Sequence, residues 1–381
     1  MWKGKGVLTP FDDYPVHQTS LPLAHAGGGH PDHYDRFWFN GYRDDLYFAV
    51  ALGTYPNRDV IDAAFSTVYG GVQRSVFASG RLPLDRSETR IGPIRIEIVE
   101  PLRVNRVRVD APEQGIVADL IFTARTAAYE EPRQVRWAGH RLAMDVTRAT
   151  QLGSWSGRLR TGDTSLDFPA AKGSDAVVYG TKDRSWGIRP VGDPTPSAPA
   201  AGEAQIFFLW APVNFGDRCL HYMVFEDAAG QPWSETAAVL PVIGPEVAVF
   251  GPGTAAQPLR RVEHAIDWAP GLRRSKSARL TLHLPAGGTE HVALDPLLTF
   301  RMRGAGYFHP VWTHGRWHQE LSVGGEEHRV EELDCLALDC IHVQQVVRAS
   351  WGERRGLGVL EQLAIGPHAP SGFTDLLGPS Q

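Results

Sequence analysis

Residues 37–50, FWFNGYRDDLYFAV, decide the fold class of this chain. They contain two runs of aromatic and aliphatic residues, 37–42 and 46–50, separated by the turn-forming pair Asp44-Asp45. This composition is typical of a β-hairpin. Residues 94–99 (IRIEIV) and 104–109 (VNRVRV) alternate apolar and polar side chains, and 116–126 form a longer apolar run. Because alternate residues of a strand point to opposite faces, these segments predict strands with one face on a core.

The second half of the chain also contains segments with the composition of β-strands. Residues 191–204, rich in Pro, Ala and Gly, predict a long loop, and strand-like runs resume at 205–210, 219–225, 278–284 and 341–349. The best helix candidate is 59–68, with Asp59 as its cap and apolar residues at positions 60, 63, 64 and 68. Strands that recur roughly every 8–12 residues, with almost no helical periodicity, favour an all-β sandwich or barrel.

A chain of 381 residues exceeds one ordinary domain. We expect an N-terminal arm at 1–34, a first β domain at 35–180, and a second β domain at 181–381 that contains the loop 191–204. The hydrophobic content of 43% is sufficient for two cores. The 11 Trp and 16 Phe indicate either aromatic-lined pockets or plain packing of β cores.

Charge and cysteine usage exclude several classes of protein. The net charge is −5 and no basic stripe occurs, which gives no support to nucleic-acid binding. No apolar run approaches the roughly 18 residues of a membrane span, and no signal peptide is recognisable, so we expect a soluble cytoplasmic protein. Three cysteines without close pairing argue against a disulfide framework. The sequence does not give the oligomeric state, and a homodimer is compatible with it.

Motifs for common cofactors are missing from the sequence. Gly27-Gly28-Gly29 is not followed by the Lys-Ser/Thr of a phosphate-binding loop, and neither a Gly-x-Ser-x-Gly elbow nor a Cys-x-x-Cys pair occurs. Hydride, phosphoryl and acyl transfer therefore have no anchor, and we expect no cofactor and no resident metal.

The octet 183–190, DRSWGIRP, is the leading candidate for chemistry. A carboxylic acid that an apolar setting keeps neutral can protonate an alkene, and an indole face can stabilise the resulting cation. Asp183 would be the acid, with Trp186 beside it, while Arg184 and Arg189 would lower its pKa. The alternative is a buried Asp–Arg ion pair that only fastens the two domains together.

A second cluster lies at 307–320, YFHPVWTHGRWHQE. If this segment is a strand, His314, His318 and Glu320 share one face. The cluster is compatible with a metal site, with a polar pocket lining in which His314 and His318 relay protons, or with structural hydrogen bonding alone. His309 and Trp317 are expected to contact the ligand in the second case.

Two further segments supply candidate ligand contacts. The arm contains Tyr14, His17 and the run HPDHYD at 30–35, which is compatible with a metal site or with a cover over a barrel mouth. In the latter case Tyr14 and His17 face the ligand. Trp38 is a further candidate contact, and Glu361 follows an apolar run, where it faces either a cavity or a pairing arginine.

These segments resemble an uncharacterised bacterial family within the superfamily of carotenoid 1,2-hydratases (hydroxyneurosporene synthases) and lipocalin-like Diels–Alderases. The likeness is carried by DDYPVHQ (12–18), DRFWFNG (35–41), YPNR (55–58), DRSWG (183–187), HGRWH (314–318) and GLGVLE (356–361). It implies tandem lipocalin-like (calycin-type) antiparallel β-barrels packed side by side, with an apolar ligand inside a barrel or between barrels. It also implies cofactor-free chemistry on an isoprenoid or polyketide-like substrate.

Two functional hypotheses follow. The first is a cofactor-independent lyase or isomerase, of hydratase, dehydratase or cyclase type, that acts by proton transfer on a terpenoid, steroid-like or polyketide substrate. The second is a non-catalytic carrier of apolar small molecules, a role that such barrels also serve. The feature that discriminates them is whether ionisable groups reach the apolar cavity.

Overall fold

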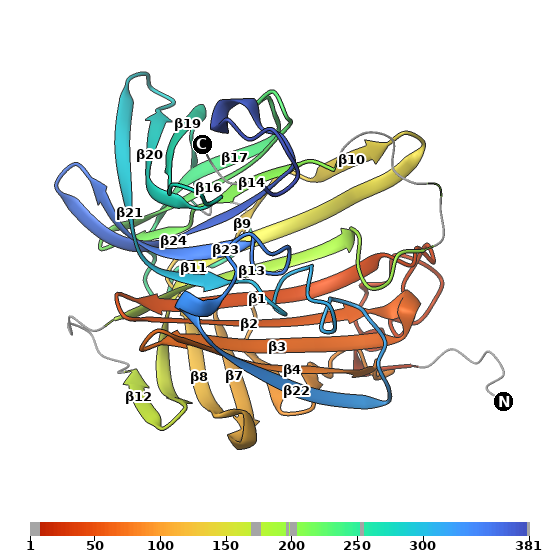
Figure 1. Cartoon of the computed structure of the whole chain (residues 1–381). Coiled ribbons are helices and arrows are strands. Elements are labelled where there is room, and N and C mark those ends of the chain that lie inside the picture. Colours follow the sequence, from red (N-terminus) through yellow and green to blue (C-terminus); the bar gives the residue numbers. More distant parts are fainter. Residues whose placement is uncertain (1–7, 169–176, 196–197, 199–203, 252–254, 379–381) are drawn as a thin grey trace.

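The computed structural model describes residues 8–168, 177–195, 198, 204–251 and 255–378. The all-β prediction is confirmed: these residues form strands β1 to β24 and five short 3-10 helices, with no α-helix among them. The 3-10 helices are η1 (Pro10–Asp13), η2 (Pro56–Arg58), η3 (Pro112–Gln114), η4 (Val330–Glu332) and η5 (Ala369–Ser371). The strands build two antiparallel sheets that pack against each other (Figure 1).

The first sheet curls into a nearly closed barrel. Its strand order is β22 (Leu321–Arg329), β4 (Val72–Arg81), β3 (Val60–Tyr69), β2 (Leu46–Tyr55), β1 (His33–Arg43), β13 (Val178–Ile188), β11 (Arg141–Thr161), β8 (Ile116–Ala124), β7 (Val104–Ala111), β6 (Ile94–Glu100) and β5 (Arg90–Ile91). Three short strands also pair with β11: β9 (Tyr129–Glu130), β10 (Gln134–Ala138) and β12 (Thr164–Phe168).

The second sheet is built from the C-terminal half. Its order is β18 (Gln257–Pro258), β17 (Pro232–Pro241), β16 (Arg218–Glu226), β14 (Ile206–Trp210), β24 (Arg354–Ile365), β23 (Val343–Trp351), β21 (Thr289–Arg301), β20 (Ser275–His283) and β19 (Arg261–Trp268). The short β15 (Val213–Phe215) bridges β16 and β24.

Three hydrophobic clusters hold the molecule together. One fills the interior of the first sheet, one fills the concave side of the second, and a third lies between the two sheets. Strand β1 contributes to two of them, because Phe37 and Phe39 point into the first cluster while Trp38 points into the third. Strands at the sheet–sheet contact are therefore buried on both faces, and β2 has no exposed residue. Buried apolar side chains thus fill the inner side of each sheet as well as most of the contact between the sheets.

Close backbone approach inside the first barrel explains why residue 180 is a glycine. A Cβ on Gly180 of β13 would lie 2.2 Å from Nε1 of Trp155 and 2.3 Å from the carbonyl oxygen of Asn40. The same indole nitrogen donates a hydrogen bond to that carbonyl at 2.8 Å. Only glycine at position 180 leaves room for the Trp155 ring to reach β1.

The helix expected at 59–68 is wrong, because residues 60–69 form strand β3. Asp59 does not cap a helix; it adopts the left-handed conformation, with φ of 57°, at the end of η2. Strand β3 is buried on both faces along most of its length, so its sequence lacks the alternation that identifies a half-exposed strand.

The sheets do not follow the chain in two simple halves. Strand β13, in which the expected boundary at 180/181 lies, belongs wholly to the first sheet and pairs with β1 and β11. Strand β22, from the C-terminal half, also returns to the first sheet and pairs with β4, as Figure 1 shows. Of the expected loop 191–204, residues 196–197 and 199–203 lie outside the described residues, and the others form no strand.

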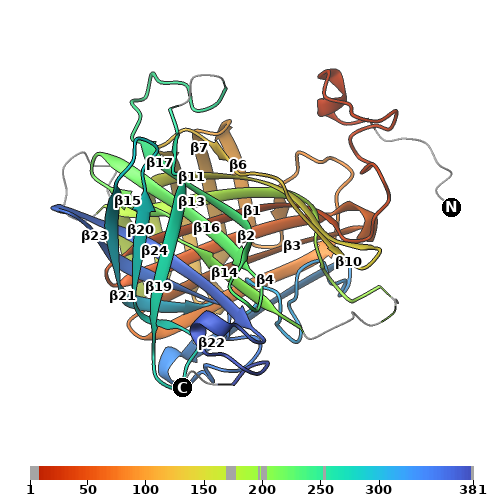
Figure 2. The same ribbon diagram turned by 90° about the horizontal axis from the view of Figure 1, so that it is seen from above.

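The N-terminal arm projects from the body of the molecule (Figure 2). Its described part, from residue 8 to the start of β1, contains η1 and otherwise irregular structure. None of the helices in the described part of the chain has the length and apolarity that a membrane crossing requires. The three cysteines are unpaired.

Candidate functional site

A cavity of about 480 Å³ lies between the two sheets. Most of its wall is apolar and comes from both sheets, including Trp38, Val146, Phe208, Trp210, Phe225, Met302 and Leu363. Ionisable side chains also line it: Arg36, Arg148, Asp183, Arg189, Tyr307, His314, His342 and Glu361. The size is within the usual range for small-molecule sites, roughly 300–1,000 Å³, and so is the mixture of apolar wall and few polar groups.

Asp183 is buried in the wall formed by the first sheet. On β13 it lies opposite Trp38 of β1 and opposite Thr150 of β11. Burial is the main influence on its carboxyl group and raises the pKa, while the nearby Arg148 opposes this effect. Oδ2 lies 3.4 Å from Nε of Arg148, and Oδ1 is buried without a hydrogen-bond partner. Asp183 is thus a buried acid whose nearest cation is Arg148.

The cation that pairs with Asp183 is neither of the two arginines that we expected to act on it. Arg184 points the other way, where it pairs with Asp35 at 2.7 Å, and its guanidinium lies over the Phe37 ring. Arg189 lines the cavity, and its positive charge lowers the pKa of Asp183, but it forms no ion pair with Asp183 because its guanidinium lies over Tyr34. Arg148 takes the role instead, because β11 and β13 are neighbours in the sheet. The ion pair joins two strands of one sheet and does not fasten the two sheets together.

A second buried acid, Glu131, lies behind Arg148. Its Oε1 accepts a hydrogen bond from Thr150 at 2.8 Å and lies 3.3 Å from His221 of β16. Burial raises the pKa of Glu131 and lowers the pKa of His221 to about 3, so His221 is neutral. Sequence patterns did not reveal this group, since its members are far apart in the chain.

The opposite wall contains a hydrogen-bonded acid, Glu361 of β24. Its Oε1 lies 2.6 Å from Nε2 of His342, and its Oε2 accepts a hydrogen bond from Gln344 at 2.5 Å. Gln344 in turn accepts hydrogen bonds from Tyr47 and Asn40 of the first sheet. Of the two alternatives for Glu361, the structure favours the cavity, and its partner is a histidine. Nδ1 of His342 is buried without a partner.

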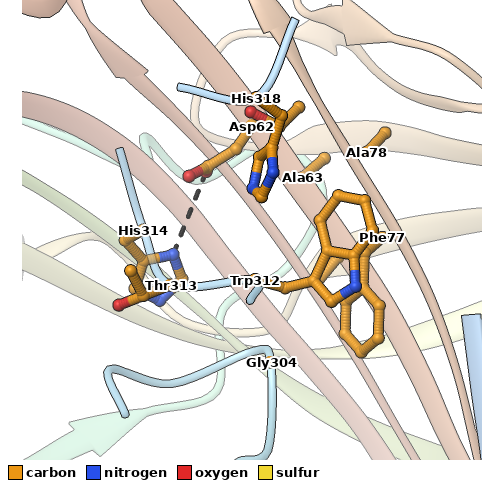
Figure 3. A pocket seen from close by; sticks show the side chains of 11 residues that line it. Asp62, Ala63, Phe77, Ala78, Gly304, Trp312, Thr313, His314 and His318 are labelled. Carbon is orange, nitrogen blue, oxygen red and sulfur yellow. Dashed lines mark ion pairs between the residues drawn. The ribbon is translucent and has the colours of Figure 1, made fainter. Parts of the chain in front are cut away.

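His314 separates the cavity from a much smaller hollow of about 10 Å³, drawn in Figure 3. One ring nitrogen lies 3.1 Å from the carbonyl oxygen of Ala305, and the other lies 3.9 Å from Asp62. Burial, together with the positive charge of Arg36, lowers the pKa of His314 to about 4. His314 is therefore neutral at pH 7. His318 lines only the small hollow, where it contacts Trp312.

The lowered pKa of His314 makes a prediction for stability. Between its unfolded value near 6.5 and its folded value near 4, the unfolded chain binds the proton and the folded chain does not. Stability is therefore lost as the pH falls through this window, by about 2–3 kcal/mol between pH 7 and pH 4.5. His314→Asn lacks the titrating imidazole, so its free energy of unfolding should fall by about 2–3 kcal/mol less than that of the wild type over this pH range. Urea titrations at several pH values measure this difference. The exposed His140 supplies the control in His140→Asn, and an equal loss in all three proteins would contradict the assignment.

Six of the expected site residues lie outside the large cavity: His318, which lines only the small hollow, and five others. Tyr14 is 60% exposed, and His17 pairs with Asp12 at 2.7 Å in the arm, so the arm does not present them to the ligand. Trp186 is 41% exposed, because it lies on the outer side of β13. Trp317 is 43% exposed and its ring is covered by Arg81. His309 is buried and holds Glu326 at 2.9 Å, which fastens a loop.

Residues 307–320 do not form the strand that was considered for them, since they form turns and irregular structure before β22 begins at Leu321. His314, His318 and Glu320 consequently do not share a strand face, and Glu320 pairs with Arg81. Among the described residues, no group of three or more His, Cys, Asp or Glu is arranged to hold a metal ion. Of the expected residues, Trp38, Asp183, Arg189, His314 and Glu361 come together in the cavity.

Comparison with known proteins places the chain in a family. A family model described as "Family of unknown function (DUF8625)" matches residues 8–374, nearly the whole chain. The chain belongs to this family. No curated protein matches.

Two solved structures resemble the DUF8625 chain in fold. The crystal structure of a candidate AttH from Nitrosomonas europaea has a TM-score of 0.52 at 14% identity, with 94% of this chain and 97% of that chain covered. CghA with Sch210972 has a TM-score of 0.45 at 13% identity, with coverage of 88% and 89%. The first comparison supports the lipocalin-like fold.

Proposed function

We propose that the cavity between the sheets binds a hydrophobic small molecule and that Asp183 transfers a proton to it without a cofactor. The single observation that carries this proposal is a buried carboxylic acid with a raised pKa in the wall of a cavity whose lining is mostly apolar. Such an acid stays protonated where an ordinary carboxyl group would be ionised, and can therefore donate its proton. The reaction class is that of a hydratase, dehydratase, isomerase or cyclase on a terpenoid, steroid-like or polyketide substrate.

The chemistry follows from the groups around Asp183. Transfer of its proton to a carbon–carbon double bond forms a C–H bond from the π electrons and leaves a cation on the neighbouring carbon. Arg148, at 3.4 Å, then stabilises the carboxylate that remains. Trp38, opposite Asp183 on β1, offers an indole face to the cation. This role was expected for Trp186, which lies outside the cavity.

A base on the opposite wall completes the proposal. His342 has one nitrogen against Glu361 at 2.6 Å and the other unpartnered. A carboxylate that holds one imidazole nitrogen leaves the other free to accept a proton. We assign His342 the removal of a proton from the substrate cation, or from water that attacks it. The first outcome is isomerisation and the second is hydration.

The alternative is a carrier of apolar molecules, and the position of Arg148 favours it. A guanidinium at 3.4 Å opposes the rise in the pKa of Asp183, and an ionised Asp183 would be a structural anion with no proton to give. Both functions need a cavity that binds a ligand, and only the proton-transfer function needs Asp183 in its protonated form.

Ligand binding in the cavity is common to both functions, and a binding experiment tests it. We expect phenylnaphthylamine, a neutral fluorescent apolar probe, to bind saturably, and a mass spectrum of organic extracts of the purified protein to show one class of co-purified apolar compound. That compound should displace the probe. Absence of saturable fluorescence enhancement would contradict any ligand site, whereas binding without conversion of the extracted compound would leave the carrier function.

A further inference from the structure

Two arginines in the cavity wall have no anionic partner. Arg36 and Arg189 are 5% and 6% exposed, and both line the cavity. Neither forms an ion pair with a carboxylate within 4.0 Å in the part of the chain that the structure describes, and Nε of each is buried without a hydrogen-bond partner. Arg148 differs, because it has both Asp183 and Glu131 within that distance.

Arg36 and Arg189 make only a few contacts, and these offset little of the free-energy cost of burying their charges. Arg36 donates one hydrogen bond at 2.8 Å to the carbonyl oxygen of Ala305, and its guanidinium lies 5.4 Å from the Trp38 ring. The Arg189 guanidinium lies 4.1 Å from the ring of Tyr34 and 5.1 Å from that of Tyr307. Guanidinium groups stay charged in proteins, and a buried charge without a counter-ion costs several kcal/mol.

The two cations belong to one region of the wall. Tyr34, Arg36 and Trp38 alternate along β1 and so point to the same side of the sheet. Arg189 follows the end of β13, where Ile188 is paired with His33, and it reaches the Tyr34 ring. Both guanidinium groups are near enough to His314 to act on its imidazole.

Neither acid that lines the cavity forms an ion pair with these cations. Asp183 and Glu361 are the acidic residues that line it, and the first is held by Arg148 while the second is held by His342 and Gln344. We propose that Arg36 and Arg189 form an anion subsite for the ligand, and that the ligand is therefore a hydrophobic molecule with a carboxylate group. The planar guanidinium matches a carboxylate, and a charge-assisted hydrogen bond is about twice as strong as a neutral one.

This inference names the substrate class of the proposed site and rests on the proposed use of the cavity. A carboxylate held at Arg36 and Arg189 fixes one end of the molecule, while its apolar part contacts the aromatic wall. The anchored end then determines which carbon lies beside Asp183. A neutral hydrocarbon would leave both cations uncompensated.

The test uses binding alone, so its result is independent of whether Asp183 catalyses any reaction. Dodecanoate and dodecanol, which differ only in the head group, are titrated against bound phenylnaphthylamine at pH 8, where the acid is ionised. We expect wild-type protein to bind dodecanoate roughly tenfold more tightly than dodecanol. In Arg36→Gln and Arg189→Gln, the affinity for dodecanoate should fall by roughly tenfold, whereas that for dodecanol should change by less than about twofold.

Arg184→Gln is the matched control, because Arg184 lies on the same strand as Asp183 but outside the cavity. It should keep the full preference for the acid. Equal affinities of the wild-type protein for dodecanoate and dodecanol would overturn the proposal, and this comparison needs no variant to fold. A preference that survives in both cavity variants, or that disappears equally in Arg184→Gln, would overturn it as well. If the neutral probe itself does not bind, the cavity proposal fails first.

Discussion

Replacing Asp183 with asparagine is expected to lower turnover of the co-purified compound by about 10²–10⁴-fold, the usual contribution of a positioned general acid. The amide has the same shape but carries no acidic proton. The fold should persist, because Arg148 keeps Glu131 within 4.0 Å after the change. Affinity for phenylnaphthylamine should also persist, since the apolar wall is unaltered. Single-turnover rates, probe titration and thermal unfolding measure the three quantities.

The pH dependence of the turnover rate tests the role of Asp183 in a second way. The protonated form of Asp183 is the donor, so the wild-type rate should fall as the pH rises through its raised pKa, and Asp183→Asn should lose this limb. The exposed Asp167, which pairs with Arg158 on the same sheet, offers a control in Asp167→Asn. Turnover within about tenfold of wild type in Asp183→Asn would remove Asp183 as the acid. Unfolding of the variant would instead assign it a structural role.

The largest loss of stability is expected from Trp155→Ala, at about 3–5 kcal/mol. Trp155 is 3% exposed, and its ring lies 5.2–5.7 Å from the rings of Phe39, Phe48 and Phe122 inside the first barrel. The change also removes the hydrogen bond to the Asn40 carbonyl. Urea unfolding measures the free energy, and probe affinity should be unaltered because Trp155 faces away from the cavity.

Trp137→Ala is the control for this change. Trp137 of β10 is 61% exposed, so its removal should alter the free energy of unfolding by less than about 0.5 kcal/mol. A cost below about 1 kcal/mol for Trp155→Ala would indicate that the first barrel is not packed. The ligand would then have a second place to bind, within the barrel itself.

Local pattern was enough to predict much of the fold. Residues 94–99 alternate because β6 has one face on the core, and the hairpin at 37–50 is formed by β1 and β2. The same reasoning failed at 59–68, where burial of both faces removes the alternation. The return of β22 to the first sheet also has no local signal, because it depends on pairing with β4, about 250 residues away.

The site was predicted only where one residue stands out from its neighbours. Asp183 did so as an acid beside arginines and a tryptophan, and Glu361 did so as an acid after an apolar run. His342 offers a similar signal, a polar residue within the run 341–349, that was not used. Arg148 and Glu131 could not be found in this way, because they meet Asp183 and His221 only through strand pairing. Trp186 and Trp317 were wrongly placed, since composition does not tell which face of a segment is buried.

The most direct test of the whole account is the location of a bound ligand. Crystals of the protein with terminally brominated dodecanoate give an anomalous bromine signal that marks one end of the molecule. We predict the bromine among Phe208, Trp210 and the other apolar residues of the wall, and the carboxylate beside Arg36 and Arg189. Bromine inside either barrel core, or no ordered ligand between β13 and β24, would contradict the central claim.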